Sequence, residues 1–484
     1  MTNILPPLYR NHWPKLAFVI FLTGLGFSLA LLPLKLAGVA VAGAILFFLI
    51  LLQPKTGLYL LIITIPFRSL VQVSLGGATI GLMEGLLGLM LLAWLLSMTV
   101  QGKIVIPYPP LLWPFLIFLG AIALSWLNTV SIRASLIETI KWLEMLALYL
   151  FICANFEAKE SRWLVMALML AGLAQAGLGL YQFLFKAGPE GFLLFGGRFL
   201  RAFGTFRQPN PYAGYLGLIL PLSLAVTLWG LDHLKGVLSK PKETSLFILA
   251  GSSLGLMLIA LFASQSRGAW IAFLGAAMVT VLLKGGRWAL ALTGALIAAA
   301  ILISMGALAL LPETVSQRFV DALPFLNIPD ITRVELTDAN FAILERLAHW
   351  RAAEGMWLDH LWLGVGFGNY EVVYPAYAIG RWLDPLGHAH NYFLNLGAEA
   401  GIVGLVGYFL FWAWVTGYAM YGLLRSKAAG LNRAILAGCM GIIAHLHIHN
   451  LLDNLYVQGM YLHIALVLSL ITLIVLHTRP SGSL

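Results

Sequence analysis

The sequence has little charge. Of its 484 residues, only 10% are Asp, Glu, Lys or Arg, whereas 60% are hydrophobic. Such a chain is not a water-soluble globule, and its apolar runs of about 17–25 residues are long enough to cross a bilayer as helices. The alternating strands of a membrane β-barrel are absent. The predicted fold class is therefore all-α, a polytopic transmembrane helical bundle of twelve to fourteen spans.

Other absences narrow the function. The two cysteines, Cys153 and Cys439, both fall inside predicted spans and predict neither a disulfide nor a metal site. There is no Asp-x-Asp pair to hold a divalent cation and no glycine-rich P-loop to bind a nucleotide. No separate basic domain accompanies the formal charge of +9. We expect the lipid bilayer as a partner, but no nucleic acid, metal or cofactor.

No internal repeat divides the chain, so residues 1–484 are predicted to form a single integral membrane domain. The apolar run 16–32 lacks a small-residue cleavage site and is predicted to be an uncleaved first helix. The run 57–67 is short and could be half-inserted.

Two long loops interrupt the spans, at residues 186–211 and 312–392. The second is longer than a helix connector needs, which usually indicates function. Within it, Asp338 can cap a helix over residues 340–358 that carries an apolar stripe. This pattern predicts an amphipathic helix on the outer membrane surface.

The basic residues differ in kind between the two sides of the membrane. With the N-terminus in the cytoplasm, eleven of thirteen outer basic residues are Arg, against six of fifteen on the cytoplasmic side. Arg presents a planar fork that suits bidentate phosphate binding, whereas Lys serves as a general anchor. This bias predicts an anion site on the outer, periplasmic face, and a diphosphate fits it.

Two motifs supply candidate anion-binding arginines. Arg267 lies in Ser-Arg-Gly-Ala-Trp (266–270), where one span closes and the next opens. An Arg there either meets a fixed anion or snorkels to lipid headgroups. Arg201 and Arg207 lie in a segment, interrupted by glycine and proline, that leads into the predicted span 212–231. This segment either points backbone N–H groups at a ligand or is a helix start with two headgroup-binding arginines.

Histidines mark the other candidate positions. His390, just before a span, is suited to accept a proton from a sugar hydroxyl, although a lone His is more often structural. His388 and His390 could ligate a metal only with additional carboxylates. His445, His449 and Asp453 share one helix face and predict either a zinc site or, as we prefer, a polar network. Asp453 could also orient a catalytic His by accepting its second N–H.

Together these motifs resemble one family, the O-antigen ligases and O-antigen polymerases, which also includes the bacterial O-linked oligosaccharyltransferases. The resemblance covers about residues 175–460. It is carried, in order, by Arg267 in 266–270, Arg346 in Glu-Arg-x-x-x-Trp (345–350), Gly-x-Gly-x-Gly (364–368), and His390-Asn391 followed by Gly401-Ile-Val-Gly404.

The resemblance implies a metal-independent, inverting glycosyltransferase in the bacterial inner membrane. It would move an oligo- or polysaccharide from undecaprenyl diphosphate to a hydroxyl of a glycan, lipid A core or protein, at the periplasmic face. His390 would orient or deprotonate that hydroxyl, and arginines would bind and stabilise the diphosphate. The implied diphosphate-binding residues are Arg201, Arg207, Arg267 and Arg346, and the supporting residues are Asn391, Asp453 and His449.

Two alternatives stay open. A polymerase would use the same chemistry to extend the glycan on its own lipid carrier. A small-anion transporter, of the bicarbonate type, would instead need broken helices with polar residues near the midplane of the membrane. The arginines cluster at the outer boundary, which favours an enzyme.

Overall fold

The structure is a computed structural model. It describes residues 33–70, 72–75, 78–104, 106–194, 197–304, 331–337, 340–426 and 430–477, together with 23, 24, 26 and 27. The predicted cap Asp338 and all but four residues of the predicted first span, 16–32, lie outside these residues.

The chain divides into two compact units, residues 1–58 with 86–104 and residues 59–85 with 105–484. The first unit holds helix α2 (Leu34–Leu52), the start of α3 (Pro54–Thr64) and most of α4 (Leu82–Val100). Gly57 lets α3 approach α4, because a Cβ there would lie 3.1 Å from the Met90 side chain. The single domain over residues 1–484 stays a prediction.

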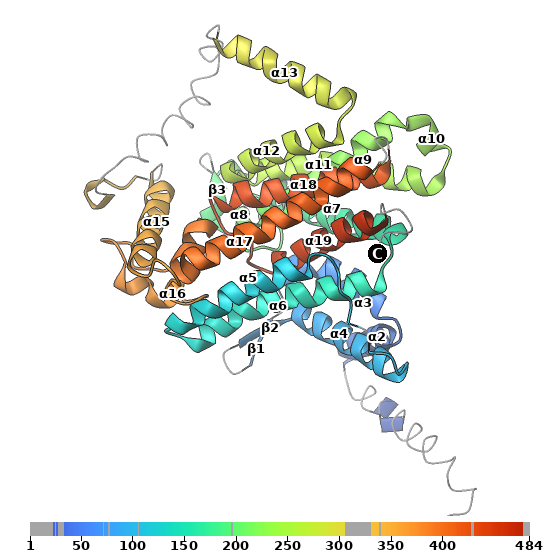
Figure 1. Cartoon of the computed structure of the whole chain (residues 1–484), viewed down its shortest axis with the longest axis horizontal. Coiled ribbons are helices and arrows are strands. Elements are labelled where there is room, and N and C mark those ends of the chain that lie inside the picture. The colour runs from blue at the N-terminus through green and yellow to red at the C-terminus, as the bar shows by residue number, and fades with distance from the viewer. Residues whose placement is uncertain are drawn as a thin grey trace, which may run out of the picture. The chain divides into compact units, whose positions relative to one another are not determined.

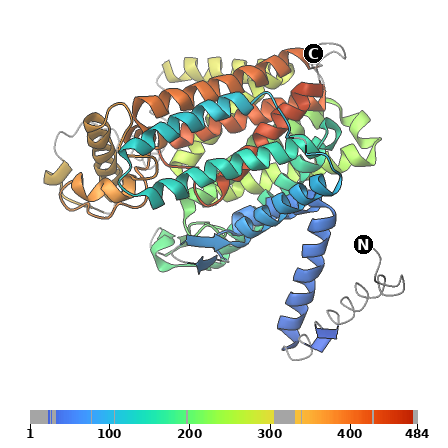
Figure 2. The ribbon, with the colours of Figure 1, turned by 60° about the horizontal axis from the view of Figure 1, so that its bottom comes forward.

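The second unit is almost entirely helical, and its long helices run side by side (Figures 1 and 2). The only strands among the described residues form two antiparallel hairpins, β1–β2 and β3–β4. The all-α fold class is confirmed. The elements are η1 (Ile65–Phe67), β1 (Gln72–Leu75), β2 (Ala78–Gly81), α5 (Leu112–Ser125), η2 (Trp126–Asn128), α6 (Ile132–Asn155), η3 (Ala158–Glu160), α7 (Ser161–Phe185), η4 (Glu190–Phe192), β3 (Leu193–Leu194), β4 (Phe199–Leu200), α8 (Pro209–Gly217), α9 (Leu220–Asp232), α10 (Leu234–Leu238), α11 (Pro241–Ala263), α12 (Arg267–Lys284), α13 (Arg287–Ser304), η7 (Ile331–Arg333), α15 (Phe341–Asp359), α16 (Tyr370–Val373), η8 (Tyr374–Ala376), α17 (Tyr392–Arg425), α18 (Leu431–Asn450) and α19 (Met460–His477).

Within the described residues, nine helices are long and apolar enough to cross a membrane, and three apolar helices are shorter. The predicted short run 57–67 is one of these three, since α3 and η1 together span Pro54–Phe67. Helix α6 has 24 residues, but it carries charged side chains at Arg133, Glu138, Lys141 and Glu144. The chain is therefore a multi-pass membrane protein.

Small residues let the helices of this unit approach closely. Helix α18 packs against α12 and α9, and α17 packs against α5. A Cβ on Gly438 would lie 2.8 Å from the backbone of Leu222, and one on Gly441 would overlap Thr280. Close packing fixes which helix ends meet. Figure 1 shows α15 and α16 at one end of the long helices and α10 at the other.

Helix α17 is broken at Gly401, which has φ 62° and ψ −161°. The break frees the N–H groups of Ile402 and Val403, and these donate to the carbonyls of Leu361 and Trp362, at 2.9 and 3.2 Å. The loop that carries the Gly-x-Gly-x-Gly motif therefore docks into the broken helix, with its backbone groups satisfied there.

We expect Gly401→Ala to destabilise the protein by more than about 1 kcal/mol, because alanine disfavours this backbone conformation. The added Cβ would also lie 2.3 Å from the backbone carbonyl of Trp362. Thermal unfolding of purified protein in detergent measures the loss. Gly417→Ala in the same helix is the control, since its Cβ meets nothing within 4 Å. Equal melting temperatures for the two variants would contradict the role of Gly401.

Candidate functional site

Arg267 begins helix α12 immediately after a tight hairpin. Helix α11 ends at Ala263, so the motif at 266–270 closes one helix and opens the next, as predicted. The Trp270 indole N–H donates to the carbonyl of Leu261 at 2.9 Å, and its ring stacks on Phe262. These contacts fix Arg267 at a helix N-terminus, where backbone N–H groups favour a bound anion.

The same hairpin holds Arg201. The N–H of Ala202 donates to the carbonyl of Ala263 at 3.1 Å, and the Arg201 Nε donates to the carbonyl of Ser264 at 2.9 Å. A second guanidinium nitrogen donates to the side-chain oxygen of Asn210 at 3.2 Å. Two side-chain contacts therefore fix Arg201 beside the start of α12, and the backbone of the next residue is held by a third.

Three arginines lie close together here. The pKa of Arg201 is lowered to about 10. Burial is the largest cause, and the positive charges of Arg346 and Arg267 are the others. Among the described residues, neither Arg201 nor Arg346 has an ion-pair partner. Like charges held together and partly desolvated repel one another, and a bound anion would offset that repulsion beyond what Glu345 does at Arg346. We call Arg201, Arg267 and Arg346 the arginine cluster.

Arg207 is engaged elsewhere. It adopts φ 58°, and its guanidinium donates to the carbonyl of Ser69 at 2.7 Å. Its charge is not among those that act on Arg201. The contact joins the 201–207 loop to the turn after η1, which gives Arg207 a structural role. Its predicted part in diphosphate binding stays a prediction.

Helix α15 supplies Arg346 close to where the sequence predicted a surface helix over 340–358. Leu344 and Leu347 on its apolar stripe are buried, as an amphipathic helix requires. His349 is buried as well, although the stripe pattern places it beside the apolar face. Its Nδ1 lies 2.9 Å from the Tyr370 hydroxyl, and its ring stacks on Tyr374. Segment 370–376 covers this side of α15, and that packing explains the difference.

The backbone around His390 is tightly specified. His390 has φ 52°, a conformation that costs a non-glycine residue free energy and often marks a functional site. Its N–H donates to His388 Nδ1 at 3.1 Å, and its carbonyl accepts from the Trp350 indole at 3.3 Å. Asn391 caps α17 by accepting from the N–H groups of Phe393 and Leu394. These contacts fix the position of the imidazole.

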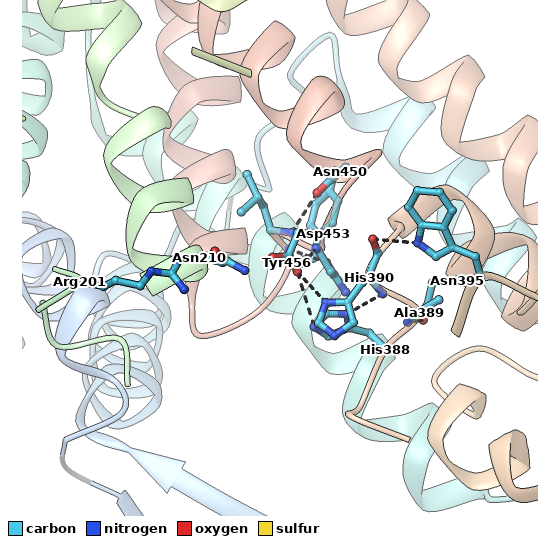
Figure 3. A network of polar contacts seen from close by, with 12 residues as sticks. Arg201, Asn210, His388, Ala389, His390, Asn395, Asn450, Asp453 and Tyr456 are labelled. Carbon is cyan, nitrogen blue, oxygen red and sulfur yellow. Dashed lines mark hydrogen bonds and ion pairs between the residues drawn. The ribbon is translucent and has the colours of Figure 1, made fainter. Parts of the chain in front are cut away.

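Asp453 is the group toward which both histidines point (Figure 3). His390 Nδ1 lies 3.4 Å from its Oδ1, and His388 Nε2 lies 3.9 Å from the same atom. Burial raises the pKa of the Asp453 carboxyl, but the hydrogen bond from His390 and the histidine charges outweigh burial and hold it below its usual range. If Nδ1 of His390 donates to Asp453, its Nε2 carries a lone pair and can accept a proton. Asp453 and His390 thus form a carboxylate–histidine pair.

His449 supports this pair from α18. It is buried, and its carbonyl accepts from the N–H of Asp453 at 3.0 Å. Its Nδ1 lies 3.4 Å from His445 Nε2, so these two histidines contact each other. The side chain of Asp453 instead turns toward His388 and His390. The sequence prediction placed His445, His449 and Asp453 on one helix face, but α18 ends at Asn450, so Asp453 lies beyond that face.

The three donors His388, His390 and Asp453 could also hold a metal ion. Their ligand atoms all lie within 4.8 Å of one another. Asp453 is the additional carboxylate that a site at His388 and His390 requires. Two imidazoles with one carboxylate suit zinc and similar ions, whereas Mg²⁺ and Mn²⁺ prefer oxygen ligands.

We expect His349 to make stability depend on pH. Burial, aided by the charge of His390, lowers its pKa from about 6.5 to about 4. The neutral form is therefore the one that the fold accommodates, so this contribution is complete above pH 6.5 and is lost as pH falls toward 4. The unfolding temperature should fall across that window, and less steeply in His349→Asn. An unchanged slope in the variant would contradict this role.

Sequence reasoning missed the residues that hold the 201–207 loop. Gln182 accepts from the N–H groups of Phe203 and Gly204, and Gln175 accepts from that of Thr205. Both glutamines are buried in the otherwise apolar helix α7. They lie seven residues apart and so share a helix face. A pair of amides on one face of a predicted span was the available signal.

One comparison finds a similarity to a known family. Residues 252–409 match the family model described as O-Antigen ligase. The match runs from within α11 to within α17, so it includes Arg267, Arg346 and His390 and leaves out Arg201 and Asp453. A comparison with curated proteins finds no match for the chain.

Proposed function

We propose that this chain, whose residues 252–409 match the O-antigen ligase family model, is a metal-independent, inverting glycosyltransferase that acts at the periplasmic face of the bacterial inner membrane. Its donor is an oligo- or polysaccharide on undecaprenyl diphosphate. Its acceptor is a hydroxyl of lipid A core. The alternative acceptors are a hydroxyl of another glycan or of a protein.

The observation that carries this proposal is the arginine cluster beside the His390–Asp453 pair. The acceptor oxygen forms a bond to C1 of the donor sugar, and the bond from C1 to the phosphate oxygen breaks. The electron pair leaves with the diphosphate, whose charge the arginines stabilise. The hydroxyl proton passes to Nε2 of His390, while Asp453 orients the ring and stabilises the imidazolium.

Metal independence is supported by the chemistry of the residues. Guanidinium groups of Arg201, Arg267 and Arg346 supply the positive charge that a divalent ion would otherwise bring to the leaving group. The two imidazoles and one carboxylate beside them are a poor set for Mg²⁺ or Mn²⁺. Asp453 also orients His390 in the proposed mechanism, which requires its carboxylate to contact His390.

The test is a transfer assay with purified protein in lipid nanodiscs. The donor is undecaprenyl-diphosphate oligosaccharide, and the acceptors are lipid A core, a hydroxyl-bearing protein, and a second donor molecule. We expect product on lipid A core, an inverted anomeric linkage by NMR, and no loss of rate in EDTA. Product only on the second donor would make the protein a polymerase. Absence of any product, or full inhibition by EDTA, would overturn the proposal.

We expect the site to face the periplasm, and cysteine labelling tests this. Two exposed residues are each replaced by cysteine: Arg381, between η8 and α17, and Lys242, at the opposite end of α11 from Ala263. Native Cys439 is buried and Cys153 is half-buried, so they should contribute little background. An impermeant maleimide added to spheroplasts should label R381C and spare K242C. The reverse pattern would place the site in the cytoplasm.

A further inference from the structure

A second polar site lies behind His388, away from the arginine cluster. It is a cavity of about 300 Å³ between α6, α16 and the start of α17. This volume is at the lower end of the range for small-molecule sites and gives room for a sugar residue. Its polar lining includes Glu138, Lys141, Glu371, His388, Asn395 and Glu399.

The Gly-x-Gly-x-Gly loop at 364–368 builds one wall of the cavity. Phe367 and Gly368 line it directly. A Cβ on Gly368 would lie 2.8 Å from the side chain of Glu138 and 2.7 Å from the carbonyl of Ala134, so glycine lets the loop rest on α6. Asn369 fixes that position, because its side-chain oxygen accepts from the N–H of Ser131 at 2.6 Å. The motif thus serves to shape this cavity.

The lining suits hydroxyl groups and disfavours phosphate. It holds three carboxyl groups and one ammonium. Glu138 is paired with Lys141, and Glu399 accepts from the N–H of Tyr370 at 3.1 Å, so Glu371 is the carboxylate left for a ligand. Carboxylates accept hydrogen bonds from sugar hydroxyls but repel an anionic diphosphate. Tyr392 and Asn454 also line the cavity.

The cavity adjoins the proposed base. His388 lines it, and the rings of His388 and His390 are 4.5 Å apart. In Figure 3, Arg201 and Asn210 lie on one side of Asp453, and His388 and Asn395 lie on the other. The pair His390–Asp453 is therefore flanked by a cationic group and by a cavity rich in carboxyls. Attack with inversion requires the acceptor to approach from the face opposite the leaving group, which this arrangement allows.

We infer that this cavity is the acceptor subsite, and that it binds the accepting sugar residue, uncharged or amine-bearing, through its hydroxyl groups. The inference rests on the proposed function. His388 acts there as a positioning residue, because its Nδ1 accepts from the N–H of His390 and its Nε2 faces Asp453. The donor diphosphate stays with the arginine cluster.

Two-substrate kinetics test the inference, with the acceptor that the wild-type protein uses in the transfer assay. Ile137 lines the cavity and is 44% exposed, so Ile137→Trp should narrow it without disturbing the fold. Leu136→Trp is the matched control, since Leu136 is 48% exposed on the same helix and lies outside the lining. We expect Ile137→Trp to raise the acceptor KM by about tenfold or more and to leave the donor KM unchanged. Leu136→Trp should change neither.

A second, milder variant removes one charge at the mouth of the cavity. Glu371→Gln should raise the acceptor KM about fivefold, because the amide oxygen still accepts a hydrogen bond but no longer carries the charge that strengthens it. Glu354→Gln on α15 is the control. If both cavity variants keep the wild-type acceptor KM, or raise the donor KM instead, the subsite is elsewhere. Wild-type protein that makes no product would overturn the proposed function itself, so the two failures are distinguishable.

Discussion

Replacing His390 with alanine should lower the rate of glycan transfer about 10²- to 10⁴-fold while the protein stays folded, because the acceptor hydroxyl loses its base. The side chain lies in a loop and is 19% exposed, so its removal leaves no large cavity in the core. The measurement is kcat for transfer in nanodiscs, alongside the unfolding temperature. The donor KM should change little, since diphosphate binding belongs to the arginines.

Replacing Asp453, which orients His390, should also lower the rate of transfer. Asp453→Asn keeps the shape of the side chain but loses the charge that stabilises the imidazolium, so kcat should fall by less than in His390→Ala. His360→Ala is the control, because His360 is exposed at the end of α15. His390→Ala with wild-type kcat would show that another group accepts the proton. Equal losses in His360→Ala would show that the effect is not specific.

Local signals in the sequence predicted a good part of this fold. Apolar runs predict helices because each span satisfies its own backbone, and the polar interruption at 266–270 predicts a hairpin without reference to any other segment. The sequence also predicted α15 to within one residue at each end. The span count depends on composition as well as length, and α6 carries enough charge to look unlike a membrane helix. Its Glu138 and Lys141, three residues apart on the helix, pair with each other.

The site could be predicted only in part, because its contacts cross the bundle. Arg201 and Arg207 stand in one short loop and look equivalent in the sequence. The structure separates them through backbone conformation, since Arg207 turns toward Ser69 whereas Arg201 is held by Ser264. Asp453 was a candidate to orient a histidine, but nothing local identifies His390, 63 residues away, as that histidine. Such pairings depend on how whole helices pack.

The arginine cluster should be nearly as sensitive as His390. Arg346→Ala should lower kcat/KM about 10²- to 10³-fold, the loss expected when one preorganised donor to a developing negative charge is removed. Arg201→Ala should do the same, because its contacts with Ser264 and Asn210 hold it in place before the donor binds. Lysine at either position should recover little of the rate, since an ammonium cannot form two parallel hydrogen bonds to a phosphate.

The alternative explanation is that Arg346 acts only through the net positive charge of its loop, and a control variant tests this. Arg381→Ala removes an exposed arginine from the same long loop as Arg346 and should leave transfer unchanged. If Arg381→Ala were as harmful as Arg346→Ala, the loop would act through its net charge at the membrane surface. High salt separates these cases as well, because screening weakens exposed charges far more than a partly buried cluster. Transfer by the wild-type protein should therefore persist in high salt, and Arg346→Lys should remain impaired there.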